Sequence, residues 1–560
     1  MILRIPPRDD TRRARCKKAV NNKSTSWVQK GLGWCFCLRY NFGVKQKITQ
    51  EQCNIVEREG QLVFTLNSEI FIPEEAPVRL TNAQLEELDY RRLYEAYSSK
   101  GRKSVTDPRV LFKILVYGYQ CGIYTTRKLE EACRYRIDFR WLLWDEPVPD
   151  HSTISRFRTG RCAEAVEDLF YQYVRYLEEQ GETDHETVFI DGTKLESRAG
   201  RYTFVWRKSV EKHLGKIREK VYAATTATGL EELDQILAER AEGIRFVHGP
   251  GHRKSETQRE WETLDTLRQK WREYEAQLAI MGEGRNSYSK TDPDATFMRM
   301  KEDHMRNGQL KPGYNVQIGV NSEYITGIEA FSSRTDYETM VPLMETMQRQ
   351  HGKKYKTATT DAGYERFNNY LYLEANGQLS FIKPANYEQQ KSSGFKRQIG
   401  RLENMTYDAE DDSYICNQGR RLNLRRESTE LQNGRYVTTA WYRCEDCSGC
   451  PVREKCCQAK NTDQRKELRV NKTFQELRKA SLENITSEYG VFLRQCRSIQ
   501  VEGAFGLLKN DFCFRRFLTR GKKNIRTELF FLALAFDLKK LWMKRDKGRL
   551  QTHLSEISAA

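Results

Sequence analysis

The chain has 560 residues, of which 38% are hydrophobic and 31% are charged, and its formal net charge at pH 7 is +17. This length allows two to four domains with at least one sizeable core. Because we find neither a run of about 18 uncharged apolar residues nor a secretory signal pattern near the N-terminus, the composition argues against membrane and secreted proteins; we expect a soluble, cytoplasmic protein with no membrane partner.

The positive charge is concentrated near the two ends of the chain. Residues 1–50 hold 12 Lys and Arg against 2 Asp and Glu, and residues 491–550 hold 15 against 5. Each segment therefore carries +10, which leaves −3 for the other 450 residues. Such basic ends predict a polyanionic partner, most commonly nucleic acid, although surface charge also serves solubility alone.

The first two predicted segments are a leader and a helical domain. Residues 1–54 are basic and show no sustained hydrophobic period, so we expect a leader that is disordered or not part of the native protein. Residues 55–165 have a helical pattern, with one helix around Phe112–Tyr119, a break at Gly122 and a second helix over Thr126–Tyr135.

A third helix is expected near the end of this domain. The turn Pro149-Asp150-His151-Ser152-Thr153 is typical of a helix start, and the short helix after it carries Arg156 and Arg158. Two helices followed by a Ser- and Arg-rich one fit a helix-turn-helix-like DNA-binding domain, with Arg156 and Arg158 on DNA. A plain helical bundle fits the pattern almost as well.

Residues 185–545 mix strand and helix patterns, which predicts an α/β catalytic domain. The apolar run Val188–Gly192 predicts a buried strand that ends on the carboxylate of Asp191. Residues 205–300 are rich in Glu, Lys, Arg and Gln, so we expect a helical insertion rather than a new core.

A hairpin, a helix and another strand follow. Tyr314–Val320 alternates as a half-buried strand does, and Tyr324–Phe331 can pair back on it. Thr335-Asp336 is typical of a helix cap and precedes a helix that contains Met340–Met347. The strand Thr357–Asp361 then ends on a second carboxylate, at Asp361.

The last part of the chain contains a second insertion and further helices. Leu379–Lys383 predicts a short strand, and residues 390–490 form a Cys-rich insertion. From Val491 the chain turns helical, which places Glu502 on a helix, and residues 546–560 form a tail.

Asp191, Asp361 and Glu502 are the candidate catalytic residues. Phosphodiester chemistry needs an activated nucleophile and a stabilised leaving oxyanion, and two divalent ions can supply both. Mg²⁺ or Mn²⁺ takes oxygen ligands and is held by a few carboxylates. Lys509 lies seven residues after Glu502, on the same helix face, where it would meet a phosphate. The other predicted DNA contacts in this region are Arg497, Arg515 and Arg516.

Four motifs resemble the DDE transposases of bacterial insertion sequences, over roughly residues 55–545. They are Ile190-Asp191-Gly192-Thr193-Lys194, Lys311-Pro312-Gly313-Tyr314-Asn315-Val316-Gln317, Thr360-Asp361-Ala362-Gly363-Tyr364 and Val501-Glu502-Gly503-Ala504-Phe505-Gly506. The resemblance implies a ribonuclease H-like mixed sheet flanked by helices and a catalytic triad of Asp191, Asp361 and Glu502. It also implies metal-dependent cleavage and strand transfer at inverted repeats, bound by the N-terminal domain.

The helix of Glu502 departs from the family pattern at two positions. Many relatives have a Tyr seven residues and an Arg four residues before the Glu, where this chain has Gln495 and Ser498. Arg497 is one step from the second of these positions, and Lys509 matches the family's Lys seven residues after the Glu.

Five of the 15 cysteines lie between residues 444 and 457. The Cys-x2-Cys spacing favours a structural Zn²⁺, with an iron–sulfur cluster and metal-free thiols as alternatives. The predicted zinc ligands are Cys444, Cys447, Cys450 and Cys456, with Cys416 or Cys457 as alternates. A Cys-rich insertion before the catalytic Glu also occurs in the transposase branch that this chain resembles.

The leading hypothesis is a transposase that acts on double-stranded DNA as a homodimer or higher oligomer. Two alternatives stay open. One is a catalytically silent DNA-binding protein derived from a transposase, and the other is a stand-alone ribonuclease H-like DNA nuclease that cuts without joining.

Overall fold

The computed structural model describes residues 68–97, 104–248, 253–300, 308–432, 434–457 and 465–553. All of them belong to one compact unit, residues 67–560. The predicted leader, residues 1–54, lies outside the described residues, as do the last seven residues of the predicted tail.

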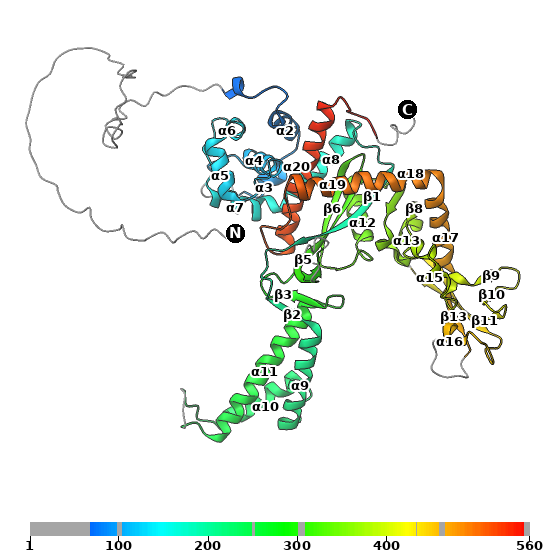
Figure 1. The fold of residues 1–560 in the computed structure, drawn as a ribbon. Coiled ribbons are helices and arrows are strands. Elements are labelled where there is room, and N and C mark those ends of the chain that lie inside the picture. The colour runs from blue at the N-terminus through cyan, green and yellow to red at the C-terminus, as the bar shows by residue number, and fades with distance from the viewer. Residues whose placement is uncertain are drawn as a thin grey trace, which may run out of the picture. The chain divides into compact units, whose positions relative to one another are not determined.

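A six-stranded mixed sheet forms the centre of this unit (Figure 1). Its strands are β1 (Thr187–Glu196), β4 (Thr296–Arg299), β5 (Leu310–Asn321), β6 (Tyr324–Phe331), β7 (Thr357–Thr360) and β8 (Leu379–Ile382). The order is β4-β5-β1-β7-β8, and β6 also pairs with β5. β1 runs antiparallel to β5 and parallel to β7, and β7 runs parallel to β8. The expected mixed sheet flanked by helices is confirmed.

The two faces of the sheet are both covered by helices. Because side chains alternate along a strand, Val188 and Ile190 on β1 share one core with Leu343 of α12 (Met340–His351). Phe189, between them, joins a second core together with α20 (Lys522–Asp546). β5 is therefore buried along nearly its whole length, whereas alternation in the sequence predicted only a half-buried strand.

Helices at both ends of the chain share the second core. The N-terminal ones are α2 (Pro77–Glu86), α3 (Arg91–Glu95), α4 (Pro108–Gln120), α5 (Thr126–Tyr135), α6 (Ile137–Leu143), α7 (His151–Thr159) and α8 (Val166–Glu179). α20 contacts α4 and α8 as well as β6, and its side chains are buried without a break from Thr527 to Leu538. A helix that is buried on all sides belongs inside a core, so α20 joins the N-terminal helices to the sheet.

The helical insertion comprises three helices and one pair of short strands. α9 (Arg207–Thr225), α10 (Leu230–Glu242) and α11 (Glu256–Met281) share their own core. β2 (Phe204–Trp206) and β3 (Ser287–Ser289) pair at their base. β4 belongs to the main sheet instead, through its pairing with β5. The predicted insertion, residues 205–300, therefore extends too far, because a four-residue strand leaves no periodic signal of its own.

The Cys-rich segment contains a separate antiparallel sheet. Its strands are β9 (Thr406–Asp408), β10 (Ser413–Ile415), β11 (Arg421–Gln432), β12 (Arg435–Cys444) and β13 (Glu467–Asn471), in the order β13-β12-β11-β10-β9. The short helix α16 (Arg453–Cys456) follows β12, and α17 (Lys472–Thr486) leads back to the main sheet, where it packs against β8.

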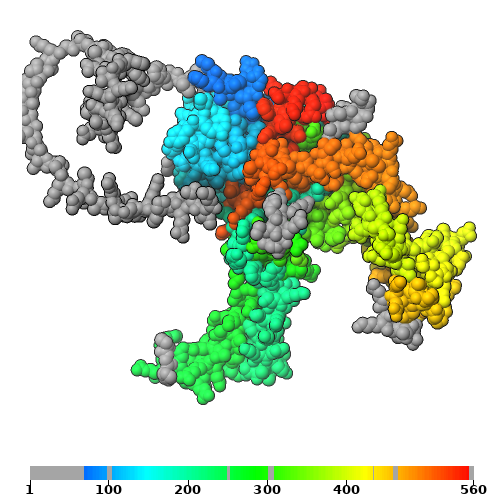
Figure 2. Space-filling model, viewed as in Figure 1, coloured from blue at the N-terminus to red at the C-terminus, as the bar shows by residue number. Residues whose placement is uncertain are grey.

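One long helical segment carries Glu502. It begins with α18 (Glu488–Arg497), continues through the π-helical turn η5 (Ser498–Glu502) and α19 (Gly503–Gly506), and ends with a second π-helical turn, η6 (Leu507–Asp511). η5 contacts β1 and β5. Figure 2 shows this segment, in orange, at the surface of the face in view. Such wide turns are rare and occur often at functional sites.

None of the helices in the described ranges combines the length and the hydrophobicity that a transmembrane span requires.

Candidate active site

Asp191 and Asp361 lie side by side where the pairing of the parallel strands β1 and β7 ends. In the parallel pair of β1 and β7, Ile190 pairs with Thr360, and each aspartate is the next residue of its chain. β7 ends before Asp361, but β1 continues past Asp191 to Glu196, paired there with β5. The prediction that Asp191 ends its strand was therefore wrong, since the antiparallel neighbour extends β1 beyond its parallel partner.

The two carboxylates repel each other in a half-buried position. Burial raises the pKa of Asp361, and the negative charge of Asp191 raises it further. A hydrogen bond from the Gly363 N–H to Asp361 Oδ1, 2.8 Å long, and the positive charge of Arg497 act in the opposite direction. A nearby cation stabilises such a pair of carboxylates, so the donor set fits a divalent ion.

In the structure, the positively charged side chain of Arg497 lies next to these carboxylates. Its Nη1 lies 3.2 Å from Asp191 Oδ2, and the side chains of Arg497 and Asp191 are 16% and 13% exposed. The sequence predicted a DNA contact for Arg497, and the structure places its guanidinium against Asp191.

Asp336 is a third aspartate at this place, and the sequence prediction missed it. Its Oδ1 accepts hydrogen bonds from Asn315 Nδ2 at 2.7 Å and Gln317 Nε2 at 2.8 Å. Its charge also raises the pKa of Asp361. The sequence predicted a helix cap here, but α12 begins after Thr339 with no side-chain cap. Two buried amide side chains on one strand, at Asn315 and Gln317, were the signal that could have revealed the site.

Two glycines leave room for this arrangement. A Cβ atom on Gly363 would lie 3.1 Å from Asp361 Oδ1 and 3.3 Å from Asp336 Oδ2. A Cβ atom on Gly192 would lie 2.9 Å from Asp336 Oδ1 and would collide with the amide of Gln317. Gly192, one residue after Asp191, and Gly363, two residues after Asp361, therefore let a third carboxylate approach the pair closely.

Glu502 lies on the exposed side of the long helical segment. Hydrogen bonds in a π-helical turn join residues five apart, so η5 places Glu502 one turn beyond Arg497, which contacts Asp191. In a regular α-helix, residues five apart point in different directions. Within the described residues, no three His, Cys, Asp or Glu side chains are grouped as a formed metal site, so Glu502 is not grouped with the aspartate pair.

The predicted DNA-binding residues differ in their exposure. Arg156 and Arg515 are exposed. Arg516 is half exposed, and its guanidinium donates to the carbonyls of Ser197 and Ala199. Lys509 lies in η6, partly buried.

Arg158 does not lie on the surface. Only 5% of it is exposed, and its Nη1 donates a hydrogen bond of 2.8 Å to the carbonyl of Tyr124. The prediction that Arg158 contacts DNA was therefore wrong. Arg158 is one of the buried residues of the nine-residue helix α7, and it directly follows the buried Phe157.

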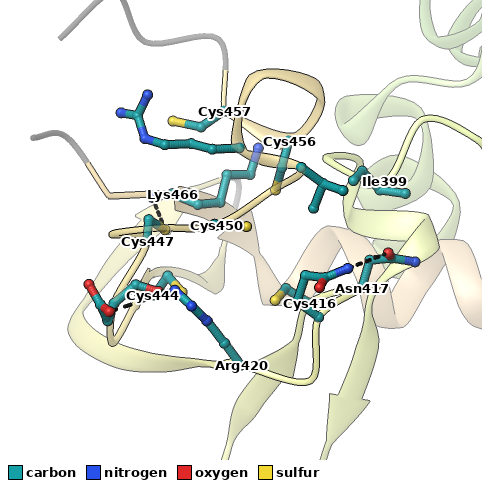
Figure 3. Close-up of a pocket in the computed structure, with 14 residues that line it drawn as sticks. Ile399, Cys416, Asn417, Arg420, Cys444, Cys447, Cys450, Cys456, Cys457 and Lys466 are labelled. Atoms are coloured by element: carbon teal, nitrogen blue, oxygen red, sulfur yellow. Dashed lines mark hydrogen bonds and ion pairs between the residues drawn. The ribbon is translucent and has the colours of Figure 1, made fainter. Parts of the chain in front are cut away.

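The cysteines of the second sheet gather around one cavity (Figure 3). The residues that line it include Cys416, Cys444, Cys447, Cys450, Cys456 and Cys457. All of the predicted zinc ligands and both alternates are thus close to the same space.

Two family models match parts of the chain. Residues 66–160 match the model described as a transposase domain (DUF772), and residues 415–542 match the model described as a transposase DDE domain. The first match covers helices α2 to α7, and the second extends from the cysteine sheet through Glu502 into α20. No curated protein and no solved structure matches the chain. The chain therefore carries a DUF772 transposase domain in its N-terminal helices and a transposase DDE domain in the segment that contains Glu502.

Proposed function

We propose that the protein is a transposase that binds the terminal inverted repeats of a mobile DNA element and catalyses metal-dependent strand cleavage and strand transfer. The observation that carries the proposal is the pair of aspartates on neighbouring parallel strands, Asp191 and Asp361. The long segment with Glu502 packs against the strand of Asp191, since η5 contacts β1, and its match to a transposase DDE domain agrees with this role.

Asp191, Asp361 and Glu502 would hold Mg²⁺ or Mn²⁺. When bound, the ions would activate a water or a 3′-hydroxyl and stabilise the leaving oxyanion. Arg497 balances the charge of Asp191. Asn315 and Gln317 orient Asp336 toward the pair.

DNA would be held by basic side chains around this site and on the N-terminal helices. Lys509 and Arg515 follow Glu502 in the chain, and the exposed Arg156 belongs to the DUF772 match. Such side chains bind phosphates and position the duplex without reading its sequence. Because two element ends must be brought together, we propose a homodimer or higher oligomer on DNA.

The test is an assay on DNA that carries the inverted repeats flanking the gene, with Mg²⁺, with Mn²⁺ and with a chelator. We expect nicks at the 3′-ends of the element, followed by joined products with a target plasmid, only when the metal is present. A protein that shifts the DNA without cutting it would be a silent binding protein. A protein that cuts without joining would be a stand-alone nuclease. Either result contradicts the proposal.

Asp336 provides a prediction on how the site is organised. Asp336→Asn keeps an oxygen that can accept hydrogen bonds from Asn315 and Gln317 but removes the charge beside Asp361. We expect cleavage to fall about 10- to 100-fold, as is usual when a residue that supports metal ligands is changed, with little change in the urea midpoint.

Asp336→Ala is the matched comparison for stability. It removes the Asp336 acceptor of Asn315 and leaves Gln317 with Asn315 Oδ1 as its remaining acceptor; the loss costs about 1–3 kcal/mol, so the urea midpoint should fall as well. Wild-type cleavage by Asp336→Asn would show that the charge has no role in the reaction.

A further inference from the structure

The cavity in the cysteine sheet has the size of a single small occupant. Its volume is about 20 Å³, and a cavity needs roughly 10–15 Å³ to hold one water molecule. The cysteine side chains around it come from separate places in the chain, namely the turn after β10, the end of β12 and the end of α16 (Figure 3). A single metal ion fits this volume.

The backbone around the cavity presents the thiols from two turns. After β10, the Gly419 N–H donates to the Cys416 carbonyl, which closes a tight turn. At the end of β12, the Cys444 N–H donates to the Lys466 carbonyl, and the Lys466 N–H donates to Cys447 Sγ at 3.4 Å. An N–H donor aimed at a sulfur stabilises its thiolate form, and the thiolate is the form that binds metals.

The sheet around these thiols has a small core of its own. Its buried members are Met405, Tyr414, Leu422, Ala440, Tyr442, Cys444, Leu468 and Val470. Eight side chains are few for five strands, and small modules of this kind commonly depend on a structural metal or on disulfides. Every cysteine in the described part of the chain is a free thiol, so these thiols are available as metal ligands.

We propose that Cys416, Cys444, Cys447 and Cys456 bind one structural Zn²⁺, which would draw these thiols together from the ungrouped positions that they have in the described structure and hold the two turns and α16 together. Cys444 is a buried member of the core, and the other three pack against it. Cys450 lines the cavity but is not among the residues that pack against this core. Four thiolates are a complete ligand set for tetrahedral zinc.

The proposed ligand set differs from the predicted one in a single position. The sequence predicted Cys444, Cys447, Cys450 and Cys456, with Cys416 or Cys457 as alternates, and the proposal takes Cys416 in place of Cys450.

The position of the site suits a structural role. Arg478 of α17 forms an ion pair with Glu365, with 2.6 Å between Arg478 Nε and Glu365 Oε1. α17 follows directly on β13, an edge strand of the cysteine sheet. A cross-link in that sheet would therefore stabilise the start of the helical segments that lead to Glu502.

The experiment measures the metal content of the full-length chain, purified without added zinc, by elemental analysis. We expect one zinc ion per chain and no iron. After replacement by Co²⁺ we expect the strong visible absorption of a tetrahedral cobalt–thiolate site. A chain without zinc, or with iron and the brown colour of a cluster, would overturn the proposal.

Single Cys→Ser variants test the ligand set. Cys416→Ser and Cys447→Ser should lose most of the zinc, whereas Cys450→Ser should retain it. Cys513→Ser, an exposed thiol outside the sheet, is the matched control and should retain it too. If Cys450→Ser loses the zinc and Cys416→Ser keeps it, the ligand set is wrong. Because metal content and cobalt absorption are measured without DNA, the result stands apart from the proposed transposase activity.

Discussion

Asp361→Asn should abolish strand cleavage and strand transfer while leaving binding to the element's ends intact. The substitution removes a negative charge from the pair that would hold the divalent ions. A bound ion of this kind contributes several kcal/mol to transition-state stabilisation, and about 1.4 kcal/mol corresponds to a factor of ten in rate. We therefore expect a loss of at least roughly a thousandfold, measured by single-turnover cleavage of labelled DNA, with gel shifts as the binding control.

The same assay tests the other two carboxylates. Asp191→Asn and Glu502→Gln should show losses of the same order, because all three side chains would share the ions. Glu488→Gln is the matched control, since Glu488 is an exposed glutamate at the start of the same helical segment. If Glu502→Gln cleaves DNA as the wild type does, Glu502 is not a ligand, and Asp336 becomes the candidate for the third carboxylate.

The largest effect on stability is expected from Phe531→Ala. Phe531 is fully buried on α20, and its ring centroid lies 5.5 Å from that of Phe112 and 5.6 Å from that of Tyr119, both on α4. Removing a buried aromatic ring from a packed core costs about 3–5 kcal/mol. Urea unfolding followed by circular dichroism should show this decrease in the free energy of unfolding.

The Phe531→Ala substitution should destabilise the N-terminal helices and the main sheet together. Because α20 packs against the N-terminal helices and against β6, limited proteolysis during unfolding should expose sites in both regions over the same range of urea. Tyr202→Ala, a change at a side chain that is 83% exposed, is the control and should shift stability by no more than about 0.5 kcal/mol. Separate unfolding of the N-terminal helices would contradict a shared core.

Most of the main sheet could be predicted from local patterns. The apolar run before Asp191, the hairpin from Tyr314 to Phe331 and the strand before Asp361 all occur as expected. A strand or helix of sufficient length leaves a periodic signal because its own side chains alternate between core and solvent. β4 left no such signal and was assigned to the insertion, since four residues are too few to show a period.

The structure changed the roles of several polar residues. Asp336 faces the amides of Asn315 and Gln317, not the start of a helix. Arg158 donates to a backbone carbonyl in the core. In each case a polar side chain has several partners compatible with its local sequence, and the fold decides which of them it meets.

The sequence by itself determined the order of the elements and placed Asp191 and Asp361 each at the end of a predicted strand of the main sheet. Only the tertiary structure decided which other side chains join them. Arg497 meets Asp191 across 306 residues of chain, the π-helical turn puts Glu502 one turn beyond Arg497, and Cys416 reaches the cavity of Cys444 through the pairing of β10, β11 and β12. Periodicity is a local property of the chain, whereas these contacts depend on how distant elements pack and on the register in which their strands pair.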